Sequence, residues 1–252
     1  MSNLFVVGTA GAGKSLMTHA LKDLLVGKEW DVVTVNLDPG VESLPYDPDV
    51  DVRNSVNLHE LMEKYDLGPN GGLVLAADMI ASKTSELQEE INEFNADYVI
   101  FDTPGQMELF AYRPSGPFIV KQMGRGESAL LFLFDSWLMN DASNFLSLML
   151  LASSVKLRFG VPFIPILSKA DLVPDSIRKI QGWARKPGTI LDELSSKLSG
   201  DDYLLYSGLL RTLSSKGFIS RLWPVSSSSG EGILDLSAAI ANMFQGGEDQ
   251  AG

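Results

Sequence analysis

The chain has 252 residues, of which 45% are hydrophobic and 21% are charged, so its composition is that of an ordinary globular protein. Its net charge of −12 disfavours broad contact with a phosphate backbone, and we expect no direct nucleic-acid binding. The absence of cysteine excludes disulfides, a thiol nucleophile and cysteine-ligated zinc or iron–sulfur sites. The sequence shows neither a secretory leader nor an apolar run of roughly 20 residues, so we expect a cytoplasmic protein with no membrane contact.

Short apolar runs alternate with longer helical patterns, and this alternation predicts an α/β fold with a doubly wound, mostly parallel sheet. The runs lack polar alternation, as expected of strands that are covered on both faces. The strand candidates are Leu4–Val7, Val32–Val35, Tyr98–Phe101, Leu130–Phe134, Phe163–Leu167 and, more weakly, Ile219–Val225. The helix candidates are Leu16–Val26, Leu58–Tyr65, Leu73–Phe94, Ala142–Phe159 and Ile233–Phe244.

Three regions depart from this alternation. Leu37–Val56 is rich in proline and aspartate, which predicts an ordered loop. Pro174–Gly217 contains short amphipathic pieces between glycines and prolines, which indicates a helical insertion before the last strand. The polar segment Gln245–Gly252 is expected to be a flexible tail, so that residues 1–244 form a single domain.

The segment GTAGAGKS, from Gly8 to Ser15, fills every fixed position of the GxxxxGK[ST] phosphate loop and lies between a strand and a helix. Glycines there let backbone N–H groups converge on phosphate oxygens, and the helix N-terminus adds partial positive charge. The pattern places Lys14 on the β- and γ-phosphates and the Ser15 hydroxyl on Mg²⁺. The other residues expected to bind the nucleotide here are Gly11, Ala12, Gly13 and Leu16.

A second phosphate element follows the strand candidate Tyr98–Phe101, where Asp102 precedes the sequence TPGQME. A carboxylate at the carboxyl end of a parallel strand faces the ligand crevice, so Asp102 is expected to hold Mg²⁺ through a water. The Gly105 N–H is suited to the γ-phosphate, and Gln106 is suited to orienting the attacking water. Taken alone, this segment is equally well explained as a Pro-Gly turn after a buried strand.

The segment SKAD, from Ser168 to Asp171, resembles the [NT]KxD guanine-recognition motif of GTP-binding proteins. A carboxylate accepts from both N1–H and N2–H₂ of guanine, whereas adenine offers it no such pair of donors, so Asp171 would select GTP. The stem of Lys169 would pack along the base, and Ser168, which is shorter than asparagine, leaves one polar contact open. Two further candidate contacts stand in a loop that is equally well explained as solvated: Ser226 and Ser227.

Together these motifs resemble those of the GPN-loop GTPases, in the archaeal-type homodimeric form. The name-giving tripeptide is present as Gly68-Pro69-Asn70, and it lies between the phosphate loop and DTPGQ, as it does in the family. The segment Asn36–Arg53 also resembles the family, and DTPGQME resembles the family signature DxPGQ[IM]E. The resemblance extends from Leu4 to about Phe244.

The resemblance implies a homodimer in which Asn70 enters the partner's active site and contacts the phosphate region. It also assigns Asp38 to positioning or deprotonating the water, and it provides no general arginine finger. Taken alone, a Gly-Pro-Asn tripeptide is most often a plain surface turn, and the alternative for Asp38 is a turn-forming aspartate before Pro39.

These observations predict a Mg²⁺-dependent enzyme that hydrolyses GTP to GDP and phosphate, and that acts as a homodimeric switch or assembly factor for an unknown protein client. The alternatives are a P-loop phosphotransferase, such as a nucleotide or polynucleotide kinase, or an ATPase of the same fold. Gln106 beside Asp102 favours hydrolysis over transfer to an acceptor, and Asp171 argues against ATP.

Overall fold

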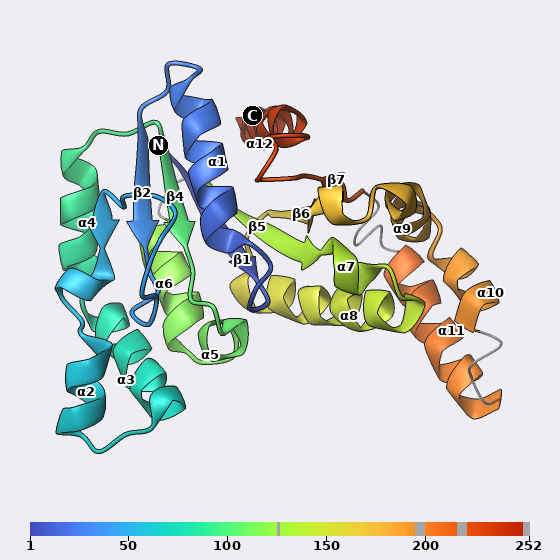
Figure 1. Cartoon of the computed structure of the whole chain (residues 1–252), viewed down its shortest axis with the longest axis horizontal. Coiled ribbons are helices and arrows are strands. Elements are labelled where there is room, and N and C mark those ends of the chain that lie inside the picture. Colours follow the sequence, from blue (N-terminus) through green and yellow to red (C-terminus); the bar gives the residue numbers. More distant parts are fainter. Residues whose placement is uncertain (125–126, 195–199, 216–220, 249–252) are drawn as a thin grey trace.

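The computed structural model describes residues 1–124, 127–194, 200–215 and 221–248 (Figure 1). All strands in these residues form one parallel sheet in the order β3-β2-β4-β1-β5-β6-β7. This arrangement confirms the predicted doubly wound fold. The strands are β1 Ser2–Gly8, β2 Val32–Asn36, β3 Val50–Asp51, β4 Tyr98–Asp102, β5 Glu127–Asp135, β6 Phe163–Ser168 and β7 Trp223–Pro224.

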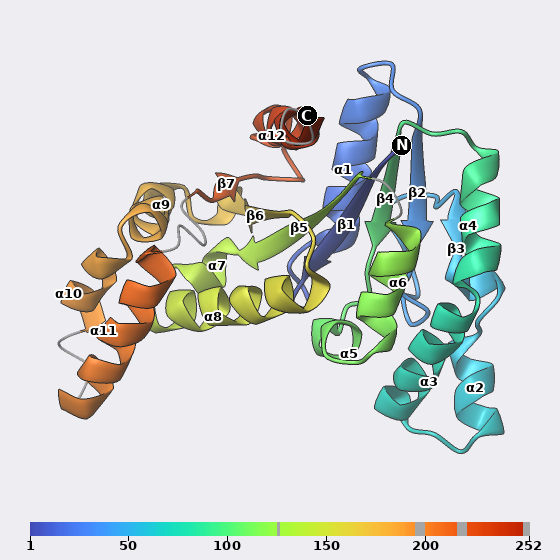
Figure 2. The same cartoon turned by 180° about the vertical axis from the view of Figure 1, so that it is seen from behind.

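Helices cover both faces of the sheet. Helices α1 and α12 lie on one face and α6 and α8 lie on the other, while α9, α10 and α11 lie together beyond β7 (Figure 1, Figure 2). The helices are α1 Lys14–Val26, α2 Leu58–Lys64, α3 Pro69–Ser82, α4 Thr84–Glu93, α5 Met107–Ala111, α6 Ser115–Met123, α7 Ser136–Met139, α8 Ala142–Phe159, α9 Ile177–Arg185, α10 Ile190–Leu194, α11 Gly200–Ser215 and α12 Ile233–Glu248.

Strand β1 supplies side chains to two apolar cores, because successive residues of a strand point to opposite faces. Leu4 and Val6 pack in the core beneath α1 and α12. Phe5 and Val7 pack in the core on the opposite face, where the Phe5 ring stacks on Phe101 with centroids 4.4 Å apart. Burial on both faces explains the unbroken apolar runs in the sequence.

The helix predicted over residues 73–94 is wrong in two respects. It begins earlier, at Pro69, because Gly68 has an extended backbone and proline is favoured in the first turn of a helix. It also ends at Ser82, since Lys83 leaves the helical conformation, with φ −100° and ψ 9°, before α4 begins. The GPN tripeptide therefore opens helix α3, rather than forming a turn ahead of it.

Other predicted elements differ in extent. The segment expected to be a loop contains the short strand β3, with Val50 buried against the sheet. The weak strand candidate is reduced to Trp223–Pro224, and its residues 219–220 lie outside the described residues. Helix α12 continues to Glu248, so the first half of the predicted flexible tail is helical, and residues 249–252 lie outside the described residues. No helix within the described ranges is long and apolar enough to cross a membrane.

Candidate functional site

The phosphate loop connects the carboxyl end of β1 to helix α1. Gly11 and Gly13 have φ values of +75° and +90°, a region that residues with a side chain rarely adopt. A Cβ at Gly8 would lie 2.8 Å from the carbonyl oxygen of Leu133, so strand β5 also requires glycine there. The loop glycines of the sequence motif are therefore required by the backbone of this chain.

Lys14, the first residue of α1, lies over the loop and is buried. Its Nζ donates hydrogen bonds to the carbonyl oxygens of Gly8 and Thr9, over 3.2 and 3.3 Å. Burial lowers the pKa of Lys14, whereas the charges of Asp102, Asp38 and Glu108 raise it. Backbone carbonyls of the phosphate loop thus hold the Lys14 ammonium group. This group lies beside the place where the phosphates of a nucleotide are expected to bind.

Asp102 ends strand β4, which lies beside β1, and its side chain is only 2% exposed. Burial raises the pKa of this carboxyl to about 6, against the lowering effect of the Ser15 and Tyr46 hydroxyls and the Lys14 charge. The Tyr46 hydroxyl donates to Oδ2 over 3.1 Å. Oδ1 is buried and has no hydrogen-bond partner among the described residues.

The side chains of Ser15 and Asp102 have the chemistry of a Mg²⁺ site. Mg²⁺ keeps several waters and is bound by one or two protein groups together with substrate phosphates. The Ser15 hydroxyl and the unpartnered oxygen of Asp102 are such groups. No cluster of three or more His, Asp or Glu side chains suited to a metal occurs in the part of the chain that the structure describes, so a cage made of protein groups alone is not offered there.

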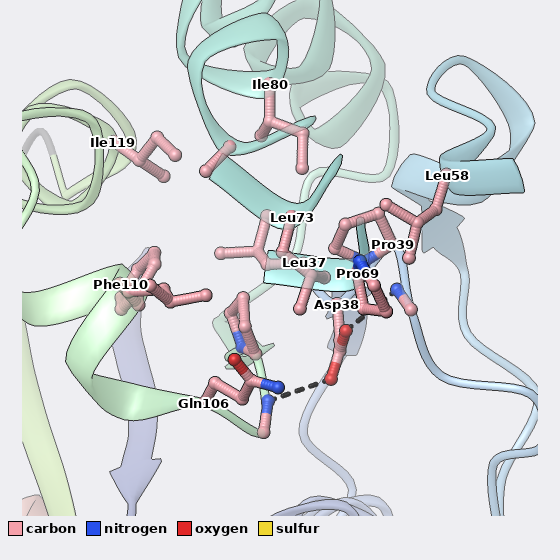
Figure 3. A pocket seen from close by; sticks show the side chains of 15 residues that line it. Leu37, Asp38, Pro39, Leu58, Pro69, Leu73, Ile80, Gln106, Phe110 and Ile119 are labelled. Carbon is pink, nitrogen blue, oxygen red and sulfur yellow. Dashed lines mark hydrogen bonds between the residues drawn. The ribbon is translucent and has the colours of Figure 1, made fainter. Parts of the chain in front are cut away.

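Asp38 joins the loop after β2 to the loop after β4. Its Oδ2 accepts a hydrogen bond from the Gly105 backbone N–H over 2.8 Å, and its Oδ1 accepts from Gly40 N–H over 2.9 Å (Figure 3). Gln106 follows at the same rim and is exposed. The structure therefore brings Asp38 next to Gly105, which lies 67 positions later in the sequence, and to its neighbour Gln106.

An apolar cavity of about 300 Å³ opens beside these residues. Figure 3 shows Asp38 and Gln106 at one side of it and Leu73, Ile80 and Ile119 farther along its wall. Pro69 also lines this cavity, so the GPN tripeptide lies next to the loops of its own chain. Asn70 follows in the first turn of α3 and is exposed.

Four of the five predicted base-recognition residues line a separate cavity of about 220 Å³, and Ser226 does not. Asp171 is exposed there, and Lys169 adopts a left-handed conformation with φ +55°. The Lys169 Nζ lies 2.7 Å from Oδ2 of Asp135, so this ion pair fixes the side chain that was expected to pack along the base. The lining residues are Ala12, Gly13, Leu16, Ser168, Lys169, Asp171, Leu172, Ser227 and Ser228.

The serines of this region have structural partners. The Ser168 hydroxyl donates to the carbonyl oxygens of Ala12 and Phe134, over 2.9 and 3.0 Å, and so ties the phosphate loop to strands β5 and β6. Ser226 is fully buried, and its hydroxyl accepts from the backbone N–H of Ser229. Ser227 lines the cavity, whereas Ser226 shapes the turn that carries it.

Sequence reasoning missed two partners in the site. Asp135 could have been found, because it ends strand β5 and faces the same edge of the sheet as Asp102. Tyr46 gave no signal, since it lies in a proline-rich loop without periodicity. Its contact with Asp102 depends on how that loop folds.

A parallel sheet whose first strand enters a glycine-rich loop and a helix, with a buried aspartate ending the adjacent strand, defines a P-loop nucleotide-binding protein. Residues 6–246 match the family model described as "Conserved hypothetical ATP binding protein". The crystal structure of a GTPase from Pyrococcus abyssi, in its apo form, is similar with a TM-score of 0.82 and 28% identity, and the match covers 94% of this chain and 95% of that one.

Curated relatives show to which family of P-loop proteins the chain belongs. GPN-loop GTPase 3 of Yarrowia lipolytica is 30% identical over 255 residues, which cover 98% of this chain and 93% of that protein. GPN-loop GTPase 3 of Saccharomyces cerevisiae is 30% identical over 256 residues, with the same two shares. The chain belongs to the GPN-loop GTPase family, as its motifs predicted.

Proposed function

We propose that this protein hydrolyses GTP to GDP and phosphate in a Mg²⁺-dependent reaction. One observation carries the proposal: the Lys14 ammonium group lies over a phosphate loop beside buried Asp102, one of whose oxygens has no hydrogen-bond partner among the residues that the structure describes. Relatives that match almost the whole chain are named GTPases, which supports the same reaction.

The roles of the phosphate-binding groups follow from their chemistry. Lys14 would turn from the carbonyls of Gly8 and Thr9 to the β- and γ-phosphates and neutralise charge as it develops. Ser15 would bind Mg²⁺ directly, and Asp102 would bind it through a water. A magnesium ion held by these two residues would neutralise part of the negative charge on the phosphates and so lower the charge that opposes attack.

The remaining groups act on the attacking water and on the γ-phosphate. Gln106 would orient the water, and Asp38 would position it or accept its proton. The Gly105 N–H would donate to a γ-phosphate oxygen. The water oxygen bonds to the γ-phosphorus as the bond to the β–γ bridging oxygen breaks, and GDP leaves with the electron pair.

Selection of guanine is assigned to Asp171, whose exposed carboxylate lines the second cavity. It would accept from N1–H and N2–H₂ of guanine, while the stem of Lys169 would pack along the base. Ser227, which lines the cavity, is the better candidate for a further base contact, since the Ser226 hydroxyl serves the turn.

We further propose a cytoplasmic homodimer in which Asn70 acts on the partner's site, as the family resemblance implies. Its exposure in the first turn of α3 is compatible with contact to a second chain. Because Asp38 and Gly105 line the 300 Å³ cavity, a nucleotide that separates them would reshape this surface. That coupling supports a role as a switch or assembly factor for a protein client.

The family description names ATP rather than GTP, so an ATPase or a phosphotransferase of the same fold is the second candidate. Competition between GTP and ATP for binding, followed by phosphate release with and without hydroxyl acceptors, separates the three activities. Preference for GTP with acceptor-independent phosphate release supports the proposal. Preference for ATP, or labelled phosphate found on an acceptor, contradicts it.

A further inference from the structure

Tyr46 reaches from the loop after β2 to the carboxylate that ends β4. Its hydroxyl donates to Oδ2 of Asp102 over 3.1 Å, across 56 positions of the sequence. The other oxygen of Asp102 stays buried and without a partner in the described part of the chain. The phenol thus occupies one oxygen of this carboxylate, and the Ser15 hydroxyl, which also lowers the pKa of the group, lies close to it.

The orientation of this carboxylate has consequences for the phosphate loop. The terminal torsion of an aspartate is broad, so the plane of the group is set by its hydrogen bonds. The ammonium group of Lys14 attracts Asp102 and would compete for its oxygens. By fixing Oδ2, the Tyr46 hydroxyl therefore restrains the carboxylate from turning toward Lys14. Lys14 then remains available to bind the phosphates.

The loop that carries Tyr46 is anchored immediately after it. Oδ2 of Asp49 accepts from the Thr34 backbone N–H over 2.7 Å and from Lys22 Nζ over 2.8 Å. Oδ1 of Asp51 accepts from the Asn36 side-chain amide over 2.9 Å. These bonds fix the chain to β2 and α1, so the position of the phenol is set by the fold.

We infer that Tyr46 is a positioning residue, which holds Asp102 in the orientation that binds the hydrated Mg²⁺ and so links the loop after β2 to the metal. The inference rests on the proposed magnesium site. It adds a function for a residue that takes no part in the reaction itself. It also predicts that removing the Tyr46 hydroxyl weakens the contribution of Mg²⁺ to nucleotide binding and leaves the other contacts of the nucleotide unchanged.

The test is the dissociation rate of a fluorescent GDP from Tyr46→Phe and from the parent protein, each measured in Mg²⁺ and in EDTA. In Mg²⁺ the variant should release GDP about tenfold faster, the change expected for losing one hydrogen bond to a charged group. In EDTA the two rates should agree, because no metal is present to be lost. A merely structural loss would speed release in both conditions.

Two comparisons make the result specific. Tyr98→Phe, at the opposite end of the same strand, removes a hydroxyl far from Asp102 and should behave as the parent in both conditions. In an Asp102→Asn background, adding Tyr46→Phe should cause little further change in the Mg²⁺-dependent ratio, because the phenol acts through the carboxylate.

The outcomes also separate the inference from the function beneath it. If Mg²⁺ does not slow GDP release from the parent protein, the proposed magnesium site itself is wrong. If Mg²⁺ slows release equally from the parent and from Tyr46→Phe, the magnesium site stands and the role of Tyr46 is overturned. Full additivity of Tyr46→Phe and Asp102→Asn would overturn it as well.

Discussion

The Asp38 carboxylate accepts a hydrogen bond from the Gly105 backbone N–H over 2.8 Å, which joins the loops that follow β2 and β4. Gly105 is the residue whose N–H is assigned to the γ-phosphate in the proposed reaction. This donor is therefore occupied in the structure by an anion of the protein's own. A triphosphate has to displace that anion, whereas a diphosphate does not reach it.

Replacing Asp38 by alanine should consequently favour GTP over GDP in binding while slowing hydrolysis. Freeing the Gly105 donor is worth about 1.5 kcal/mol, so the affinity ratio of a non-hydrolysable GTP analogue to GDP should rise roughly tenfold. Calorimetric titration of both ligands measures this ratio. Asp47→Ala, an exposed acidic residue of the same loop, controls for the loss of charge alone. An unchanged ratio in Asp38→Ala would show that the Gly105 donor does not serve the γ-phosphate.

Asp171→Asn should weaken GTP far more than ATP, because an amide cannot accept from both guanine donors. The loss of a charge-assisted bidentate contact is expected to cost about 2–4 kcal/mol of GTP binding. Titration of each nucleotide tests this, with the exposed neighbour Asp175→Asn as the matched control. Equal losses for GTP and ATP would refute the assignment of Asp171 to the base.

Lys14→Ala should abolish tight triphosphate binding, since no other side chain of the loop carries a positive charge. Lys28→Ala, which removes a lysine just beyond the opposite end of α1, should bind GTP as the parent does. Equilibrium binding of fluorescent GTP distinguishes the two variants. Parent-like affinity in Lys14→Ala would remove the basis of the phosphate-loop assignment.

The stability of the nucleotide-free protein should depend on pH through Asp102. Burial raises the pKa of this carboxyl to about 6, so the folded chain holds the proton more tightly than the unfolded chain, in which aspartate titrates near 4. Between these values the folded state binds more protons, and stability falls as the pH rises through this window. Above it, the buried charge exerts its full destabilising effect.

Asp102→Asn removes that charge and keeps an acceptor for Tyr46. The variant should raise the free energy of unfolding by about 3 kcal/mol near pH 7.5 and by much less near pH 4.5. Denaturant unfolding at both pH values measures the difference, with Asp47→Asn as an exposed control. A gain of equal size at both pH values would mean that ionisation of Asp102 is not its source.

The sequence predicted the parts of the site that depend on local order. The phosphate loop and Asp102 have fixed spacings relative to apolar strands, and the fold brings them to adjacent strands β1 and β4. Contacts between distant segments were not predictable in the same way. The Ser168 hydroxyl donates a hydrogen bond to the carbonyl oxygen of Ala12, 156 positions away, and no local sequence pattern predicts that partner.

The elements of the fold likewise divide into those that the local sequence predicted and those that it did not. The strand runs were found because burial on both faces produces continuous apolar sequence. The break between α3 and α4 was missed because buried Ile80 and Leu87 continue the helical apolar pattern across Lys83. The helical conformation ends at Lys83 although no glycine or proline marks the break in the sequence. Strand β3 escaped detection since it pairs through only two residues.

The central claim is that GTP hydrolysis needs the Asn70 of a second chain, and a mixing experiment tests it most directly. Asn70→Ala and Lys14→Ala are each expected to be inactive alone. In their mixed heterodimer, the chain with intact Lys14 would receive Asn70 from its partner. That single site should hydrolyse GTP near the parent's rate per site, and native mass spectrometry verifies that the heterodimer forms.

The reciprocal mixture gives the opposite pattern. In a heterodimer of the parent with the double variant Lys14→Ala/Asn70→Ala, the intact phosphate loop faces a partner without Asn70, so the account predicts no hydrolysis. If Asn70 acts within its own chain, the first heterodimer should be inactive and the second should retain one working site. That reversed pair of results would contradict the account.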